Sequence, residues 1–357
     1  MNYSKLKNFY EGKKVFITGA TGFKGSWLSL MLNMMGAEVY GYALKPETNP
    51  ALCDIVQLDK SVDITIGDIR DIKSLEAAYI KAKPDVVLHL AAQPIVRDSY
   101  KDPRYTYETN VMGTVNILEC LRKNPGAISF LNVTTDKVYE NNDLEDHAFK
   151  EDEKLDGFDP YSNSKSCSEL VTHSYKKSFF GDAESPAIST ARAGNVIGGG
   201  DFANDRIVPD CVRATVKGES IIVRNPYSTR PYQHVLEPLA VYLMIAMEQA
   251  DNKRYADYYN VGPGDTDCIN TGDLANYFVK YWGESANWKN MAEKNAPHEA
   301  SFLKLDCAKA RSTFGWEPVW HVDEAICETV KWYKAWNDGE NMKEFTTEQI
   351  KRFMDMR

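Results

Sequence analysis

The sequence predicts an α/β fold: a Rossmann-type doubly wound parallel sheet with a smaller C-terminal substrate-binding lobe. Three observations predict it. Short β-branched runs alternate with helical stretches in the first half of the chain, a glycine-rich turn follows the first run, and the composition changes after Asn195 to Gly-rich turns and a Pro/Arg-rich segment. Apolar runs that alternate with helices are typical of parallel strands covered on both faces.

The predicted strands and helices follow one another in a regular order. We expect strands at 15–18, 39–43, 62–66, 86–90, 130–134 and 188–192. Apolar residues at helical spacing predict helices over 25–35, 72–82, 105–122 and 238–249. We therefore assign 1–195 to the sheet domain, which regains a segment near 231–249, and 196–357 mainly to the second lobe.

Composition and charge exclude several classes of protein. The chain has 357 residues, of which 43% are hydrophobic and 26% charged, as in ordinary globular proteins. Its net charge of −9 argues against nucleic acid and against an anionic membrane surface as partners. Because there is neither a secretory apolar region nor an apolar run of roughly 18 residues, we expect a cytoplasmic protein.

The cysteines and histidines give no sign of a disulfide framework or a metal site. The seven cysteines contain no C-x-x-C pair, and the six histidines contain no H-x-x-x-H pair. This scatter is typical of reduced thiols. We predict no metal.

A glycine-rich turn directly follows the first predicted strand. It reads Thr-Gly-Ala-Thr-Gly-Phe-Lys-Gly over 18–25. Glycine permits the sharp turn and lets backbone N–H groups approach a pyrophosphate at a helix N-terminus. The strand before it and the helix after it supply the context that the motif requires. We predict dinucleotide binding by Gly19, Thr21, Gly22, Phe23, Lys24 and Gly25.

The residues alone leave the choice between NAD and NADP open. The acidic residue that usually ends the second strand is missing, and Lys45 there would suit a 2′-phosphate. Asp68 is either an adenine contact or an ordinary helix N-cap. The ends of the next two strands supply the remaining cofactor candidates, which are Asp68, Ile69, Leu90, Ala91 and Ala92.

Tyr161 and Lys165 form a Y-x-x-x-K motif, which on a helix places the two side chains one turn apart. A lysine in that position stabilises tyrosinate and lowers the phenol pKa from about 10. The same spacing recurs at 3/7, 10/14 and 79/83, so spacing alone decides nothing. Only the copy at Tyr161 follows the fifth strand, which ends in Thr135 at the sheet edge where ligands bind. Pro160 suits a helix start.

These motifs are similar to those of extended short-chain dehydrogenases, and within them to the nucleotide-sugar 4,6-dehydratases. Five blocks carry the resemblance across nearly the whole chain: 18–28, 134–139, 159–165, 191–201 and 230–238. They look most like the CDP-glucose branch. The resemblance implies NAD as the cofactor, CDP-glucose as the substrate and a role in deoxysugar biosynthesis. It makes 1–195 the NAD-binding domain and 196–357 mainly the nucleotide-sugar-binding lobe.

The resemblance also implies an internal redox cycle, in which C4 of the sugar is oxidised, water is eliminated across C5–C6, and the hydride returns to C6. Tyr161 would accept the C4 hydroxyl proton, Thr135 would bond that oxygen, and Lys165 would hold the nicotinamide ribose. Asp136 would protonate the departing C6 hydroxyl, which requires a raised pKa. Lys137 stands where the broader pattern has glutamate; it is either the C5 base, with a lowered pKa, or a solvated or phosphate-facing lysine.

Substrate contacts are assigned by the resemblance as well. Near the diphosphate and base it places Asn195, Arg206, Val208, Arg230 and His234, and near the sugar, as weaker candidates, Gln93 and Ser99. Cationic side chains there would meet the need of an acidic chain that binds an anion. The alternative for each arginine is a surface charge or an ordinary ion pair.

Other functions remain open. Another NDP-hexose 4,6-dehydratase or a 4-epimerase would keep Tyr161 and Thr135, although epimerisation has no need of an elimination acid such as Asp136. A non-catalytic dinucleotide-binding sensor or scaffold is an alternative of a different class. The helices near 105–122 and 161–178 offer a dimer surface, so we expect a homodimer or a dimer of dimers.

Overall fold

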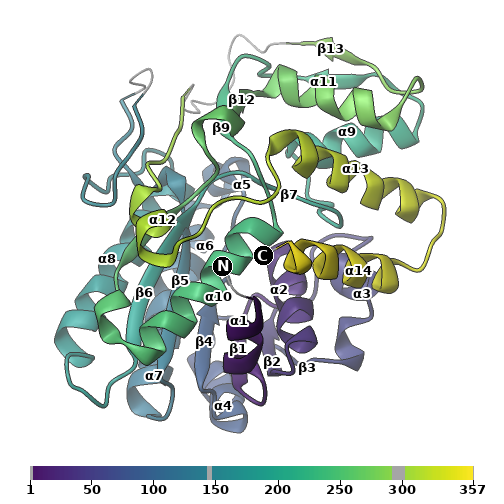
Figure 1. Cartoon of the computed structure of the whole chain (residues 1–357). Coiled ribbons are helices and arrows are strands. Elements are labelled where there is room, and N and C mark those ends of the chain that lie inside the picture. The colour runs from purple at the N-terminus through teal and green to yellow at the C-terminus, as the bar shows by residue number, and fades with distance from the viewer. Residues whose placement is uncertain (1–2, 143–146, 292–301, 357) are drawn as a thin grey trace.

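The centre of the computed structural model, which describes residues 3–142, 147–291 and 302–356, is a sheet of seven strands. Its order is β11-β6-β5-β4-β1-β2-β3, and every neighbouring pair is parallel (Figure 1). The strands are β1 (Lys14–Thr18), β2 (Glu38–Ala43), β3 (Asp63–Ile66), β4 (Val86–His89), β5 (Ser129–Thr135), β6 (Ala187–Ala193) and β11 (Tyr258–Val261). The predicted fold class is confirmed.

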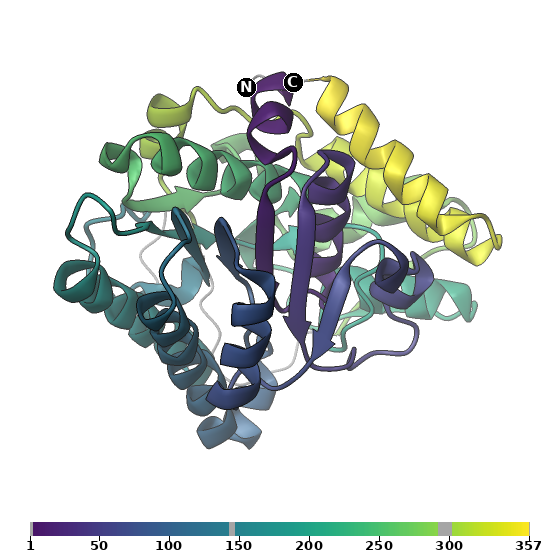
Figure 2. The same ribbon diagram turned by 90° about the horizontal axis from the view of Figure 1, so that it is seen from below.

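Helices cover both faces of this sheet (Figure 2). Successive residues of a strand point to opposite faces, so Val15 and Ile17 of β1 pack in one core with α2 (Phe23–Met34) and α10 (Leu236–Asp251). Phe16 packs in the other core. That second core is closed by α4 (Ile72–Ala82), α7 (Gly113–Lys123) and α8 (Pro160–Phe179). Burial on both faces explains why the strands read as continuous apolar runs.

The predicted helices agree with the structure except in one place. The helix expected over 105–122 is interrupted by a π-helical turn over Glu108–Met112. It therefore consists of α6 (Pro103–Tyr107), the π turn and α7. Single π turns of this kind occur frequently at functional sites.

The second half of the chain contributes one helix and one strand to the sheet domain. α10 packs against β5 and β6, and β11 adds the seventh strand beside β6, with Tyr258 opposite Thr190. The sequence did not predict β11, because its four residues, YYNV, carry a weak apolar pattern. The division into domains at 195 remains a prediction.

Shorter elements complete the molecule. The remaining helices are α1 (Tyr3–Tyr10), α3 (Leu52–Ile55), α5 (Val96–Lys101), α9 (Ile207–Val216), α11 (Thr271–Trp282), α12 (Ala308–Phe314), α13 (Val322–Asn337) and α14 (Met342–Asp355). Small two-stranded sheets pair β7 (Val196–Ile197) with β10 (Gln233–His234), β8 (Ile221–Val223) with β13 (Trp288–Asn290), and β9 (Thr229–Pro231) with β12 (Cys268–Asn270). Among the helices described, none is long and apolar enough to cross a bilayer.

Candidate active site

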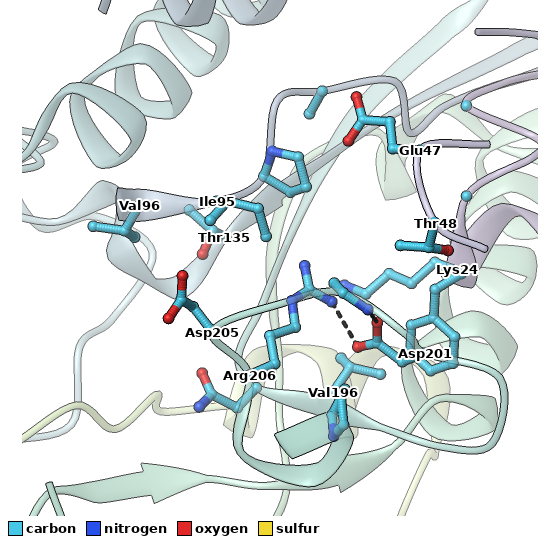
Figure 3. A pocket seen from close by; sticks show the side chains of 18 of the residues that line it. Lys24, Glu47, Thr48, Ile95, Val96, Thr135, Val196, Asp201, Asp205 and Arg206 are labelled. Atoms are coloured by element: carbon cyan, nitrogen blue, oxygen red, sulfur yellow. Dashed lines mark hydrogen bonds and ion pairs between the residues drawn. The ribbon is translucent and has the colours of Figure 1, made fainter. Parts of the chain in front are cut away.

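A cavity of about 920 Å³ lies at the carboxyl ends of the central strands. The strand order reverses between β1 and β4, and open α/β sheets bind ligands at such a switch point. One side of the cavity is lined by the turns after β1, β2, β3 and β4. The other side is lined by the end of β5, the start of α8, and the segments 193–210 and 222–232. Figure 3 shows the side chains that converge on it.

The glycine-rich turn forms the first wall of the cavity. Gly19 has φ of +78°, and a Cβ on it would lie 2.9 Å from the backbone nitrogen of Ala91. A Cβ on Gly25 would lie 2.1 Å from the Gly19 carbonyl oxygen. Gly22 caps α2 without any side-chain hydrogen bond, so the first N–H groups of this helix are available to a ligand. A pyrophosphate such as that of NAD fits this end.

Thr21 and Asp68 line the part of the cavity next to the ends of β2 and β3. Thr21 Oγ1 donates to the carbonyl oxygen of Leu44 at 2.8 Å and so ties the turn to the end of β2. Asp68 lines the cavity, and hydrogen bonds from Arg70 lower the pKa of its carboxyl. The N-cap alternative for Asp68 is wrong, because Asp71 caps α4. Ile69 lines the cavity beside it.

Small residues after β4 form the next part of the cavity wall. Leu90, Ala91 and Ala92 all line the cavity, and the first two donate their backbone N–H groups to Thr18 Oγ1, each at 3.2 Å. Behind them, His89 lies with one ring nitrogen 2.7 Å from Thr18 Oγ1. Burial lowers the pKa of His89 to about 3, so the ring is neutral and serves the core.

The structure brings Thr135, Tyr161 and Lys165 to the same cavity. Thr135 ends β5, and Asp159 caps α8 by accepting from the backbone N–H of Ser162 at 3.0 Å. Tyr161 therefore lies in the first turn of α8, and Lys165 follows one turn later. Lys165 Nζ donates to the Val133 carbonyl oxygen at 3.1 Å, which places its ammonium against β5.

The protein by itself does not supply the lowered pKa that the sequence predicts for Tyr161. Burial raises the pKa of this phenol to about 12, although its hydrogen bond with Thr135 and the charge of Arg206 act in the opposite direction. Burial also lowers the pKa of Lys165 to about 8, against the pull of Glu169. Both shifts have one cause, because a site that excludes water disfavours the charged form of each group.

Asp136 is an acid with one unused oxygen. Its side chain is buried, and Oδ1 accepts from Thr135 Oγ1 at 2.9 Å. Oδ2 has no hydrogen-bond partner. Burial raises the pKa of this carboxyl, even though Lys137 and Arg230 act to lower it. Burial favours the protonated form of such a carboxyl, which can donate its proton to a substrate oxygen.

Lys137 follows in a short 3₁₀ turn, Asp136–Val138, that continues from β5. Its backbone N–H donates to Thr135 Oγ1 at 3.4 Å, and its half-buried side chain lines the cavity. The position is compatible with either alternative, a base at C5 or a phosphate-facing lysine.

The structure brings only some of the predicted substrate residues to the cavity, namely Asn195, Arg206, Val208 and Arg230. Gln93, Ser99 and His234 do not line it, because they are engaged within the protein. Gln93 donates to Thr106 Oγ1 at 2.9 Å, and Ser99 donates to the Val96 carbonyl at 2.7 Å. The buried ring of His234 packs against two tryptophans, Trp27 and Trp320.

Several charged residues of the cavity were missed by the sequence. Asp201, which was not predicted, pairs with the predicted Arg206 at 2.8 Å (Figure 3). Asp205 pairs with Arg224 at 3.1 Å and with Arg97 at 3.7 Å. The signal for Arg224 was its place at the start of the Pro/Arg-rich segment. The others carry no local signal, because their roles depend on partners from separate segments.

The side chain of Lys24 adds a further charge to the cavity. Burial, followed by the repulsion of Arg206, lowers the pKa of this ammonium to about 8. The sequence indicated Lys24 only as part of the backbone turn.

Comparison with known proteins assigns these features to a family. The family model described as GDP-mannose 4,6 dehydratase matches residues 16–329. The chain is 46% identical over 353 residues to CDP-glucose 4,6-dehydratase of Salmonella typhimurium, with 98% of each chain covered. It is 27% identical to dTDP-glucose 4,6-dehydratase of Streptomyces antibioticus, over 90% of this chain and 93% of that protein.

Solved structures support the same architecture. The NAD complex of dTDP-glucose 4,6-dehydratase from Bacillus anthracis superposes with a TM-score of 0.74 at 21% identity, over 92% of this chain and 97% of that one. The NAD complex of UDP-glucose 4-epimerase from Thermus thermophilus gives 0.77 at 23% identity, over 90% and 98%. Identities this low support the fold and not the substrate.

Proposed function

The chain belongs to the GDP-mannose 4,6 dehydratase family, as an NAD-dependent hydro-lyase, and we propose that it converts CDP-D-glucose to CDP-4-dehydro-6-deoxy-D-glucose and water. The observation that carries the proposal is the end of β5. There Thr135 bonds a buried acid, Asp136, whose second oxygen is unused, in the cavity that also holds Tyr161 and Lys165. An epimerase needs the tyrosine and threonine but has no use for such an acid.

In the first stage the protein handles the proton of the C4 hydroxyl. Tyr161 accepts this proton while Thr135 holds the same oxygen, and the ammonium of Lys165 favours the charged phenolate. NAD, held by the glycine turn and the backbone after β4, supplies the acceptor for the C4 hydride and later its donor to C6. Because the pKa of Tyr161 is raised to about 12, mainly by burial, further positive charge near the phenol is a requirement of this stage.

In the second stage water leaves across C5–C6. The C4 ketone makes the C5 proton removable; Lys137 takes it, and Asp136 protonates the C6 hydroxyl as its bond to carbon breaks. The hydroxyl lost from C6 and the proton given by Asp136 form the water, while Lys137 holds the C5 proton and returns it to C5 when C6 is reduced. The proton taken up by Tyr161 balances the one given by Asp136. The raised pKa of Asp136 supports its role as the acid.

Substrate binding uses the cations on the other side of the cavity. Arg206 and Arg230 would meet the diphosphate, and the lining of the cavity, which includes both arginines as well as Asn195 and Val208, supports this role. Arg206 already forms an ion pair with Asp201, so its guanidinium is held in place before the anion arrives. Preorganisation of this kind improves affinity by reducing the ordering cost of binding.

The test is to supply CDP-, dTDP-, UDP- and GDP-hexoses separately to the purified protein and to measure 4-keto-6-deoxy product. We expect product from CDP-glucose. Turnover confined to another nucleotide sugar would overturn the substrate assignment. Retention of NAD with no product from any of them would favour the non-catalytic sensor.

We also propose a cytoplasmic homodimer or dimer of dimers. The π turn and α8 expose Met112 and Leu170, each close to half accessible, on the helices that the sequence indicates as a dimer surface. All seven cysteines are free, which fits a reducing compartment. Light scattering on the parent and on Leu170→Glu tests the assembly; a parent that is monomeric would contradict it.

A further inference from the structure

A buried ion pair lies behind the candidate catalytic residues, outside the lining of the cavity. Glu169 on α8 and Arg192 on β6 are 0% and 1% exposed. Arg192 Nε donates to Glu169 Oε1 at 3.0 Å, and Nη2 donates to Oε2 at 3.1 Å. Two parallel bonds make this pair bidentate, the strongest geometry for a carboxylate and a guanidinium.

The carboxylate of Glu169 also joins α8 to two strands. Oε1 accepts from Thr134 Oγ1 at 2.5 Å, and Oε2 accepts from Thr190 Oγ1 at 2.7 Å. His173, one turn further along α8, lies with Nε2 3.3 Å from Oε2. Thr134 directly precedes Thr135, so one contact of this carboxylate lies next to a residue of the proposed active site. On the far side, Arg192 Nη1 donates to the Tyr139 hydroxyl at 2.7 Å.

Glu169 and Lys165 lie on the same face of α8, because they are four residues apart. Lys165 bonds the carbonyl oxygen of Val133, and Glu169 bonds the hydroxyl of Thr134, so the two side chains hold successive residues of β5. The carboxylate acts to raise the pKa of Lys165, which burial brings down to about 8.

The other groups around Lys165 do not supply this charge. Lys24, which reaches the cavity from α2, interacts unfavourably with the ammonium, and His89 on β4 is neutral because its pKa is about 3. Tyr161, on α8 itself, is uncharged below its pKa of about 12. A buried ion pair costs several kcal/mol of desolvation per ion and often adds no stability over an apolar pair. Stability is therefore a poor explanation for Glu169 and Arg192.

We propose that Glu169, held by Arg192, is a positioning residue that keeps Lys165 protonated and in register with β5 during the reaction. The inference rests on the proposed function only for its turnover readout. It predicts that the charge of Glu169, and not merely its hydrogen bonds, sets the pH range of activity.

The first test is Glu169→Gln in the full-length, NAD-loaded protein. The amide keeps one acceptor oxygen but replaces the other with an NH2 donor and removes the negative charge, so Lys165 loses its proton at lower pH. We expect the alkaline limb of the kcat profile to move down by about one pH unit, with KM for CDP-glucose changed less than about twofold. Thr190→Val is the matched control, since it removes a hydrogen bond to the same carboxylate and keeps the charge. The alkaline limb of its kcat profile should match that of the parent.

A second variant is needed in case Glu169→Gln does not fold, because that substitution leaves Arg192 buried without its ion partner. Glu169→Leu/Arg192→Met replaces both charges with apolar side chains of similar size, a change that folded proteins often tolerate. We expect this double variant to fold and to show the same downward shift. A folded double variant with the parental alkaline limb would overturn the proposal, as would a shift of equal size in Thr190→Val.

A readout without turnover separates this inference from the substrate assignment. Acylation of Lys165 by an amine-reactive reagent, followed across pH by peptide mass spectrometry, reports the same proton directly. Labelling of Glu169→Gln should begin about one unit lower than in the parent. Unchanged labelling overturns the role of Glu169 even if CDP-glucose is the substrate, whereas a shift with no product from any nucleotide sugar overturns only the proposed function.

Discussion

The two sides of the cavity are built from different kinds of groups. The cofactor side consists of backbone and small residues. A Cβ added to Gly19 would lie within 3 Å of the backbone of Ala91, and a Cβ added to Gly25 would lie within 3 Å of the backbone of Gly19. The opposite side consists of buried charge, and burial shifts the pKa values of Asp136 and Lys165 from their ordinary range. The cofactor side therefore depends on the absence of side chains, and the catalytic side depends on charged groups that are shielded from water.

This difference has a direct consequence for substitution. On the cofactor side, adding one carbon atom should reduce NAD binding and stability more than removing a polar group does. On the catalytic side, removing one charge or one hydroxyl should abolish chemistry while the fold persists. Five variants test that contrast, from the largest expected effect to the smallest.

Gly25→Ala should have the largest effect, because the new Cβ would lie 2.1 Å from the Gly19 carbonyl oxygen, where only backbone could yield. We expect loss of bound NAD and destabilisation of at least about 3 kcal/mol. Denaturant unfolding and cofactor content measure both. Gly181→Ala, where nothing lies within 4 Å of the added atom, is the control and should match the parent. A Gly25→Ala protein that keeps NAD and parental stability breaks the contrast.

Tyr161→Phe should lower kcat by about 10²–10⁴-fold, since it removes the acceptor of the C4 hydroxyl proton. The fold and the bound NAD should remain, because the change deletes one oxygen and adds none. Product formation from CDP-glucose and the absorbance of the bound cofactor measure the two effects. Retained turnover contradicts the role of Tyr161.

Asp136→Asn should separate the two stages of the reaction. Oxidation at C4 continues, but water no longer leaves, so reduced cofactor accumulates while kcat falls by about 10²-fold or more. Absorbance of the reduced nicotinamide measures the accumulation. An unchanged rate of dehydration would remove Asp136 from the mechanism.

The same variant has a pH-dependent stability. Burial raises the folded-state pKa of Asp136 above its unfolded value, so the parent loses stability as pH rises towards the folded pKa. The amide carries no such cost. We expect the unfolding midpoint of Asp136→Asn to exceed that of the parent by a margin that grows between acidic and neutral pH. A margin independent of pH contradicts the raised pKa.

Lys137→Met tests the base at C5. We expect dehydration to slow by about 10²-fold while C4 oxidation survives, because only removal of the C5 proton is lost. Exchange of the C5 hydrogen with deuterated solvent provides the measurement. If Lys137→Met dehydrates at the parental rate while Tyr161→Phe is inactive, the lysine faces solvent or phosphate instead.

Asp68→Asn should have the smallest effect. The backbone makes most of the cofactor side, so loss of one charge that is already satisfied by Arg70 should weaken NAD binding only a few-fold. Equilibrium titration with NAD measures the change. A loss of NAD affinity as large as that of Gly25→Ala would show that side chains, and not the close approach of the backbone, hold the adenosine half of NAD.

Much of the site follows from residues that are close in sequence. The turn over 18–25 and the pair Tyr161 and Lys165 could be predicted because a strand end or one helical turn brings their members together. His234 shows the limit of such prediction. Its neighbours in sequence form a block shared with the dehydratases, yet its ring lies buried against Trp27 and Trp320.

The sequence by itself determined the periodic elements and the local motifs, because apolar spacing and turn residues act over a few positions. Only the tertiary structure decided the seventh strand, the pairing of Arg206 with Asp201, and the burial that raises the pKa of Tyr161 to about 12. The pairing of Glu169 with Arg192 belongs to the same class. Desolvation and ion pairing depend on all the segments that surround a group, and no local pattern in the chain encodes them.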